Sequence, residues 1–155
     1  MISILADFAK KNKNYEVIVK YKTGEDVNFY HTPKYIPNNL KFIHGGSGYQ
    51  LLKDCKLAIG FNSSALIEAI LASSKVLVVS FGIKRSKFKD SLLEYGGNAE
   101  YVFNEDLMKK KINDIMLNSK LIKIKKPFKK DFVDQVGYLD FKSSYRLIKI
   151  IKEKI

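Results

Sequence analysis

Cysteine is almost absent from this chain, which has only Cys55 among 155 residues. A single cysteine excludes a disulfide within the chain, and it excludes a zinc knuckle. We therefore expect a protein of the reducing cytoplasm. The two histidines, His31 and His44, have no acidic cluster near them at ligand spacing, so the sequence predicts no metal site.

Long apolar runs are also absent. Every hydrophobic stretch is interrupted by Lys, Asn or Ser before it reaches the roughly 20 residues that a membrane span needs. The first residues, MISILADFAKKNKNYE, have no basic region ahead of an apolar one, so we expect no signal peptide. Hydrophobic residues still make up 46% of the chain, which is enough for the core of one domain.

Acidic residues are outnumbered by basic ones, 16 to 28, which gives a formal net charge of +12. Such a charge suits nucleic acid, but no RNA-binding aromatic pattern, KH loop or helix-turn-helix spacing accompanies it. Abundant Lys, Asn and Ile without Trp fit the composition of an AT-rich genome, in which lysine fills exposed positions. We expect a solvated basic surface with an anionic small-molecule or membrane partner, and no nucleic-acid partner.

Strand-like and helix-like segments alternate along residues 1–118. We expect strands at 15–20, 40–44, 56–60, 75–80 and 101–103, and helices at 2–11, 49–55, 64–73 and 105–117. Repeated strand–helix–strand units predict a mostly parallel sheet with helices on both faces, a Rossmann-like three-layer α/β/α fold. The uniformly apolar segments LAIG and VLVVS are typical of strands buried on both sides.

The chain divides into two parts by composition. Residues 1–118 form the predicted Rossmann-like domain, and residues 119–155 a basic connection followed by a helix from Asp140 to Ile155. In that helix an apolar stripe opposes a face rich in Lys and Arg. We expect it to pack on the same domain. Peripheral contact with anionic lipid at the inner face of the cell membrane is the alternative.

The segment from Lys56 to Gly82, KLAIGFNSSALIEAILASSKVLVVSFG, points to a binding site. The predicted strand ends at Gly60, and Asn62–Ser64 form the turn into the next helix. Asn and Ser are helix-capping residues. The unpaired N–H groups and the positive dipole end of a helix attract phosphate. A cap without a ligand is the simpler interpretation of the two serines.

Glu68 lies one helical turn beyond Ser64 in the apolar run ALIEAILA, and no Lys or Arg stands three or four residues away to pair with it. A carboxylate among apolar neighbours costs stability unless something hydrogen-bonds it. One carboxylate can accept from two vicinal hydroxyls of a sugar, as in dinucleotide-binding folds. We therefore expect Glu68 to bind a sugar diol. An ordinary exposed glutamate on the outer side of the helix is the alternative.

This segment resembles the donor-binding half of GT-B glycosyltransferases, particularly bacterial enzymes of surface and capsular polysaccharide synthesis. In that family a strand ending in Gly leads through a small-residue turn to S-x-x-x-x-E-A and to a further strand. The matching residues here are Gly60, Asn62, Ser63, Ser64, Glu68, Ala69, Lys75 and Val76. The likeness covers residues 15–118 and is closest at 56–82.

The resemblance implies that the chain binds a nucleotide-sugar, as donor substrate and not as cofactor. Ser63, Ser64 and the helix N-terminus would hold the donor phosphates, and Glu68 the ribose hydroxyls. The glycine-rich turn would let the backbone approach the nucleotide. Further candidate ligands of the donor are His44 and Lys20 at strand ends, Gly45, Gly46, Ser47 and Gly48 in the turn, and Lys84 and Arg85 in a loop. For His44, Lys84 and Arg85 a structural or solvated role is the alternative.

GT-B enzymes bind donor and acceptor on two Rossmann-like domains, and this chain is long enough for only one of them. The resemblance therefore implies a donor-binding domain that is inactive in transfer without an N-terminal acceptor domain or a separate subunit. The sequence identifies no catalytic base. Two other functions stay open: a non-catalytic interaction or membrane-docking domain, and a nucleotide-sugar epimerase-like or phosphotransferase-like half.

Overall fold

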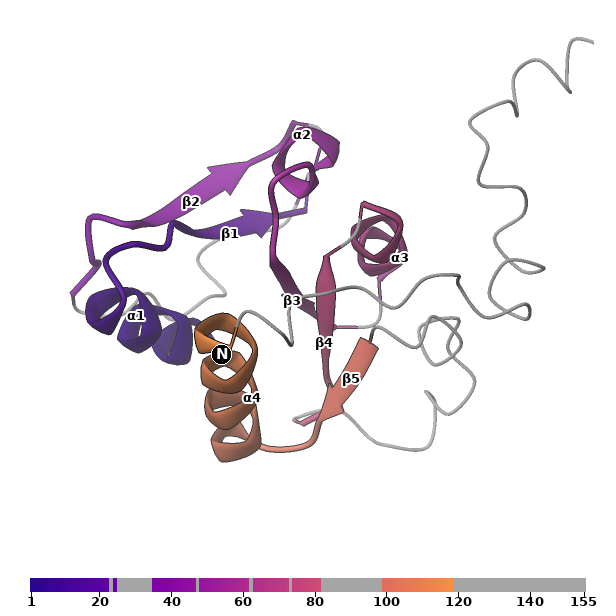
Figure 1. The fold of residues 1–155 in the computed structure, drawn as a ribbon. Helices are drawn as coiled ribbons and strands as arrows, with labels where there is room; N and C mark the ends of the chain where they lie inside the picture. Colours follow the sequence, from indigo (N-terminus) through magenta and orange to yellow (C-terminus); the bar gives the residue numbers. More distant parts are fainter. Residues whose placement is uncertain are drawn as a thin grey trace, which may run out of the picture.

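The computed structural model describes residues 1–22, 24, 35–46, 48–61, 63–72, 74–81 and 99–118. Its elements are α1 (Ile2–Lys11), β1 (Val17–Tyr21), β2 (Leu40–His44), α2 (Tyr49–Leu52), β3 (Leu57–Gly60), α3 (Ser64–Leu71), β4 (Lys75–Val79), β5 (Ala99–Val102) and α4 (Glu105–Leu117) (Figure 1). This order confirms the predicted alternation of strands and helices. The predicted helix from Asp140 to Ile155 and the basic connection before it lie outside the described residues.

The paired strands all run parallel, and they form two sheets. In the first, β1 pairs with β2, and Tyr21 lies opposite His44. In the second, β4 lies between β3 and β5, and Gly60 lies opposite Val78. The predicted parallel α/β fold is confirmed, but the single sheet is replaced by two small ones. Side chains of β1 and β3 contribute to one hydrophobic cluster, which joins the sheets by packing.

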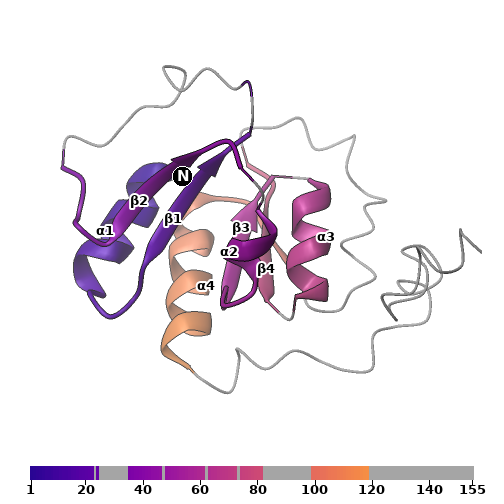
Figure 2. The same ribbon diagram turned by 90° about the horizontal axis from the view of Figure 1, so that it is seen from above.

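The side chains of the central strand β4 are buried on both faces of its sheet. Leu77 and Val79 belong to the cluster formed with α1 and α4, and Val76 and Val78 belong to the cluster formed with α3. All four are at most 2% exposed. Helices α4 and α3 accordingly cover opposite faces of the sheet (Figure 2). VLVVS is therefore buried on both sides as predicted, whereas LAIG in β3 is only half-buried because β3 is an edge strand.

Helix α1 covers one face of the β1–β2 sheet. Its small buried residues Ala6 and Ala9 pack with Val19, Tyr21 and Leu40 of the two strands. Small side chains let the helix axis approach the strands closely, and the exposed face of α1 ends in lysines. No helix within the described ranges is long and apolar enough to cross a membrane.

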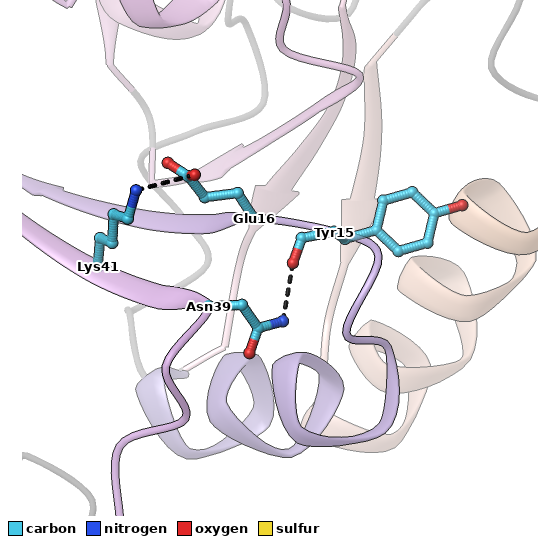
Figure 3. Close-up of polar contacts among 4 residues, drawn as sticks. All are labelled: Tyr15, Glu16, Asn39 and Lys41. Carbon is cyan, nitrogen blue, oxygen red and sulfur yellow. Dashed lines mark hydrogen bonds and ion pairs between the residues drawn. The ribbon is translucent and has the colours of Figure 1, made fainter.

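Asn39 joins the start of β2 to the end of α1 and to the loop that follows α1. Its amide nitrogen donates to the main-chain carbonyls of Tyr15 at 2.8 Å, Ala9 at 3.0 Å and Asn12 at 3.3 Å. Figure 3 shows the bond to Tyr15. These bonds add to main-chain hydrogen bonds, because the carbonyls of Ala9 and Asn12 also accept from the N–H groups of Asn12 and Tyr15. They also fix the entry to β1 beside β2.

Candidate functional site

The turn from β3 into α3 is a capped helix start. Ser63 is the N-cap, and its side-chain oxygen accepts from the backbone N–H of Ala65 at 3.3 Å. The carbonyl of Ser63 accepts from the backbone N–H of Leu66 at 3.0 Å. A hydroxyl that accepts in a cap keeps its own proton to donate. Ser63 and Ser64 are both exposed, so their hydroxyls are accessible to a ligand.

Gly60, the last residue of β3, serves the packing of α3 on the sheet. A Cβ built on this glycine would lie 3.3 Å from one methyl carbon of Leu66, closer than most real Cβ contacts. Leu66 is buried at 5% exposure in the cluster beneath α3. The absence of a side chain at Gly60 therefore lets the first turn of α3 approach the strand end, as the third glycine does in dinucleotide-binding folds.

Glu68 is exposed, so the expectation of a carboxylate surrounded by apolar neighbours is wrong. Its apolar sequence neighbours lie on other sides of the helix: Leu66 and Ile70 are buried, while Ser64 shares the exposed face with Glu68. The carboxylate is solvated, so α3 carries no burial penalty that a ligand must relieve. Ser64 and Glu68 lie four residues apart on this exposed face of α3.

A second group of predicted residues meets at the carboxyl edge of β1 and β2. Gly45 and Gly46 follow β2 with φ of 64° and 69°, in the left-handed region that favours glycine. A Cβ on Gly48 would lie 3.8 Å from two carbons of the Lys20 stem, so this stem runs along the turn. The ammonium of Lys20 donates to the carbonyl of Tyr21 at 3.3 Å.

His44 is exposed at this edge, and its ring stacks on the ring of Tyr21. The ring centroids are 4.7 Å apart and the planes differ by 28°. Tyr21 also stacks on Phe42, at 6.0 Å and 11°. Sequence reasoning missed Tyr21, because its position opposite His44 depends on the pairing of two strands far apart in the chain. The sequence does show an aromatic ring at the last position of each of these two strands, Tyr21 in β1 and His44 in β2.

The two groups lie at the carboxyl ends of different sheets, one after β3 and the other after β1 and β2. The predicted residues Asn62, Ser47, Lys84 and Arg85 lie outside the described residues. Within the described ranges, no three His, Cys, Asp or Glu side chains form a group that could hold a metal ion. The groups together offer an ammonium and hydroxyl donors for an anion, and one carboxylate for hydroxyl groups.

The geometry of the turn into α3 provides a capped helix start with an accessible carboxylate one turn later. Comparison with protein-family models, with curated proteins and with solved structures finds no match to this chain.

Proposed function

We propose that this chain is a nucleotide-sugar-binding domain of the kind that forms the donor half of a GT-B glycosyltransferase. The observation that carries the proposal is the exposed face of α3, where Ser64 in the first turn and Glu68 one turn later lie together. The helix N-terminus and hydroxyls suit a phosphate, and the carboxylate suits the vicinal hydroxyls of a ribose. For a ligand long enough to reach the other group, Lys20 near the end of β1 would add a cation.

In this proposal the chain binds donor and does not transfer sugar by itself. A GT-B enzyme forms its catalytic cleft between two domains, so the general base would come from an acceptor domain in the same polypeptide or from a separate subunit. The exposure of Glu68 supports this arrangement. If a second domain completes the donor site, the site residues of the donor-binding domain are exposed when that domain is alone. Bacterial surface-polysaccharide synthesis is the setting that the resemblance suggests.

Titration of the full chain with CMP-, UDP- and GDP-sugars tests the proposal. We expect at least one of them to shift the amide resonances of residues 60–68 in NMR spectra. Glu68→Gln should weaken that binding about tenfold or more, because a hydrogen bond to a charged group contributes about 1.5–3 kcal/mol. Ser64→Ala should weaken it with little loss of stability, since the N-cap is Ser63.

Glu105→Gln is the matched control, because Glu105 is another exposed glutamate on a helix, in the first turn of α4. It should leave donor affinity unchanged. If none of the three classes of nucleotide-sugar perturbs residues 60–68, the proposal is wrong. Vesicle binding that disappears at high salt, without donor affinity, would identify a membrane-docking domain instead. Turnover of the donor by the chain alone would identify an epimerase-like or phosphotransferase-like half.

A further inference from the structure

The rings of Phe42, Tyr21 and His44 form a short aromatic stack that ends at the carboxyl edge of the β1–β2 sheet. The middle ring, Tyr21, is buried at 6% exposure, Phe42 on one side of it is half-buried, and His44 on the other side is exposed. The inner rings are held by packing against α1, which fixes Tyr21 as a firm support for the imidazole. A ring stacked on a buried aromatic loses little freedom when another planar group covers it.

Among the described residues, the turn that follows this stack has open space around it. Gly45 and Gly46 follow His44 directly, and a Cβ built on either glycine would meet no atom of the described residues within 4 Å. The Lys20 ammonium, bonded to the Tyr21 carbonyl, lies at the same strand end. An exposed ring, an adjacent open space and a nearby cation together favour a ligand that is planar, aromatic and anionic.

We propose that His44 is a stacking platform for the heteroaromatic base of a nucleotide. The inference rests on the proposed function and assigns the base of the donor to this strand end. Stacking of a base requires only the flat face of the imidazole, so the ring acts through its shape and its π-electrons. This role differs from hydrogen-bond donation to a phosphate, which requires a ring N–H.

Three proteins separate these roles: the wild-type full chain, His44→Ala and His44→Phe. Each is titrated by calorimetry with CMP, UMP and GMP, and with ribose 5-phosphate, which has no base. For the nucleotide that binds best, His44→Ala should weaken binding about five- to twentyfold, the lower part of the range for stacking on an aromatic side chain. His44→Phe should retain affinity within about twofold, because phenylalanine also presents a flat ring. Affinity for ribose 5-phosphate should not change.

Phe103→Ala is the matched control. Phe103 is exposed, at 46%, and stacks on Tyr101 with ring centroids 6.3 Å apart, so it is an equivalent aromatic side chain after a different strand. This variant should bind nucleotides as the wild type does. Since His44 and Phe103 are exposed, all the variants are expected to fold, and circular dichroism checks this.

The proposal is overturned if nucleotides bind the wild type and His44→Ala binds them equally well. It is also overturned if His44→Phe is as weak as His44→Ala, which would assign the imidazole N–H to the ligand instead. Equal affinity of the wild type for ribose 5-phosphate and for the nucleotides would show that the base makes no contact. If the wild type binds none of the nucleotides and no nucleotide-sugar, the proposed function fails as well.

Discussion

The hydroxyl of Tyr15 donates a hydrogen bond of 2.8 Å to the main-chain carbonyl of Met116, which joins the entry to β1 to the last turn of α4. Carbonyls in the last turn of a helix have no partner within the helix, so Tyr15 satisfies one of them. Its ring lies 5.9 Å from the ring of Phe8, and the ammonium of Lys56 lies 5.6 Å from its centroid. One side chain thus links both helices on this face of the fold.

Tyr15→Phe removes this hydrogen bond and keeps the ring. We expect the free energy of unfolding to fall by about 0.5–1.5 kcal/mol, the usual net contribution of such a bond. Urea denaturation followed by circular dichroism measures it. Tyr35→Phe is the control, because Tyr35 is 63% exposed and should show no change. Equal stability of Tyr15→Phe and the wild type would show that water replaces the bond at no cost.

Asn39→Ala removes three hydrogen bonds to main-chain carbonyls at once. The carbonyls of Ala9 and Asn12 keep main-chain donors, so the main loss falls on the Tyr15 carbonyl. We expect a decrease of about 1–3 kcal/mol in the free energy of unfolding, measured by urea denaturation. Lys41→Ala in the same region is the control (Figure 3): Lys41 forms a 2.9 Å ion pair with Glu16, and both side chains are more than half exposed. Exposed pairs contribute about 0–1 kcal/mol. A larger loss in Lys41→Ala than in Asn39→Ala would contradict this assignment.

Gly60→Ala tests the close approach of α3 to β3. The added Cβ would lie 3.3 Å from a Leu66 methyl carbon, so the leucine or the helix must move, and we expect a loss of about 1–3 kcal/mol, typical of overpacking. In a double-mutant cycle, Leu66→Ala should relieve part of this loss, because the clash partner is gone. Strict additivity of the two changes would argue against a steric role for Gly60.

The reactivity of Cys55 provides a pH-dependent measurement of how far its thiol is buried. Burial raises the pKa of its thiol above the ordinary value, and hydrogen bonds from the Ser74 side chain and the Leu57 backbone oppose this effect. Thiolate is the reactive form, so the rate of alkylation should rise with pH along a curve displaced to higher pH than in the urea-unfolded chain. Coincident curves for folded and unfolded chains would contradict a buried thiol.

Ser74→Ala tests a buried hydrogen bond. The Ser74 hydroxyl is fully buried and donates to the carbonyl of Cys55 at 2.7 Å. Loss of this donor leaves a carbonyl unsatisfied, and we expect a cost of about 1–3 kcal/mol in urea unfolding. Ser64→Ala, at an exposed serine, serves as the comparison and should cost less. The reverse order would show that the Cys55 carbonyl finds another partner.

Local chemistry allowed the positions of most elements to be predicted from sequence. Helix α4 begins at Glu105 as predicted, and the Asn104 side chain caps it by accepting from the N–H of Leu107 at 2.7 Å. The strand predicted at 15–20 begins instead at Val17, because the carbonyl of Tyr15 accepts from the Asn39 side chain. The helix predicted at 49–55 ends at Leu52. The split into two sheets depends on pairing between distant strands, which local patterns do not encode.

The sequence allowed the residues of the candidate site to be chosen, but not their exposure or their neighbours from other strands. The residue types of Asn62–Ser64 predicted a helix cap in this turn, and the cap is Ser63. The spacing from Ser64 to Glu68 followed from helix periodicity. The expected burial of Glu68 was wrong, because apolar sequence neighbours occupy other sides of a helix and leave one face exposed. The stack of His44 on Tyr21 required the register between two parallel strands, which the sequence alone does not specify.

Successive side chains of β4 point to opposite faces of the sheet, so this strand contacts both the cluster beneath α4 and the cluster beneath α3. Leu77 and Val78 are adjacent in the chain, yet one packs beneath α4 and the other beneath α3. A shift of this strand by a fraction of an ångström, caused by repacking on the α4 side, displaces the platform on which α3 rests. Substitutions far from Ser64 and Glu68 can therefore alter how those two side chains are presented, without touching either of them.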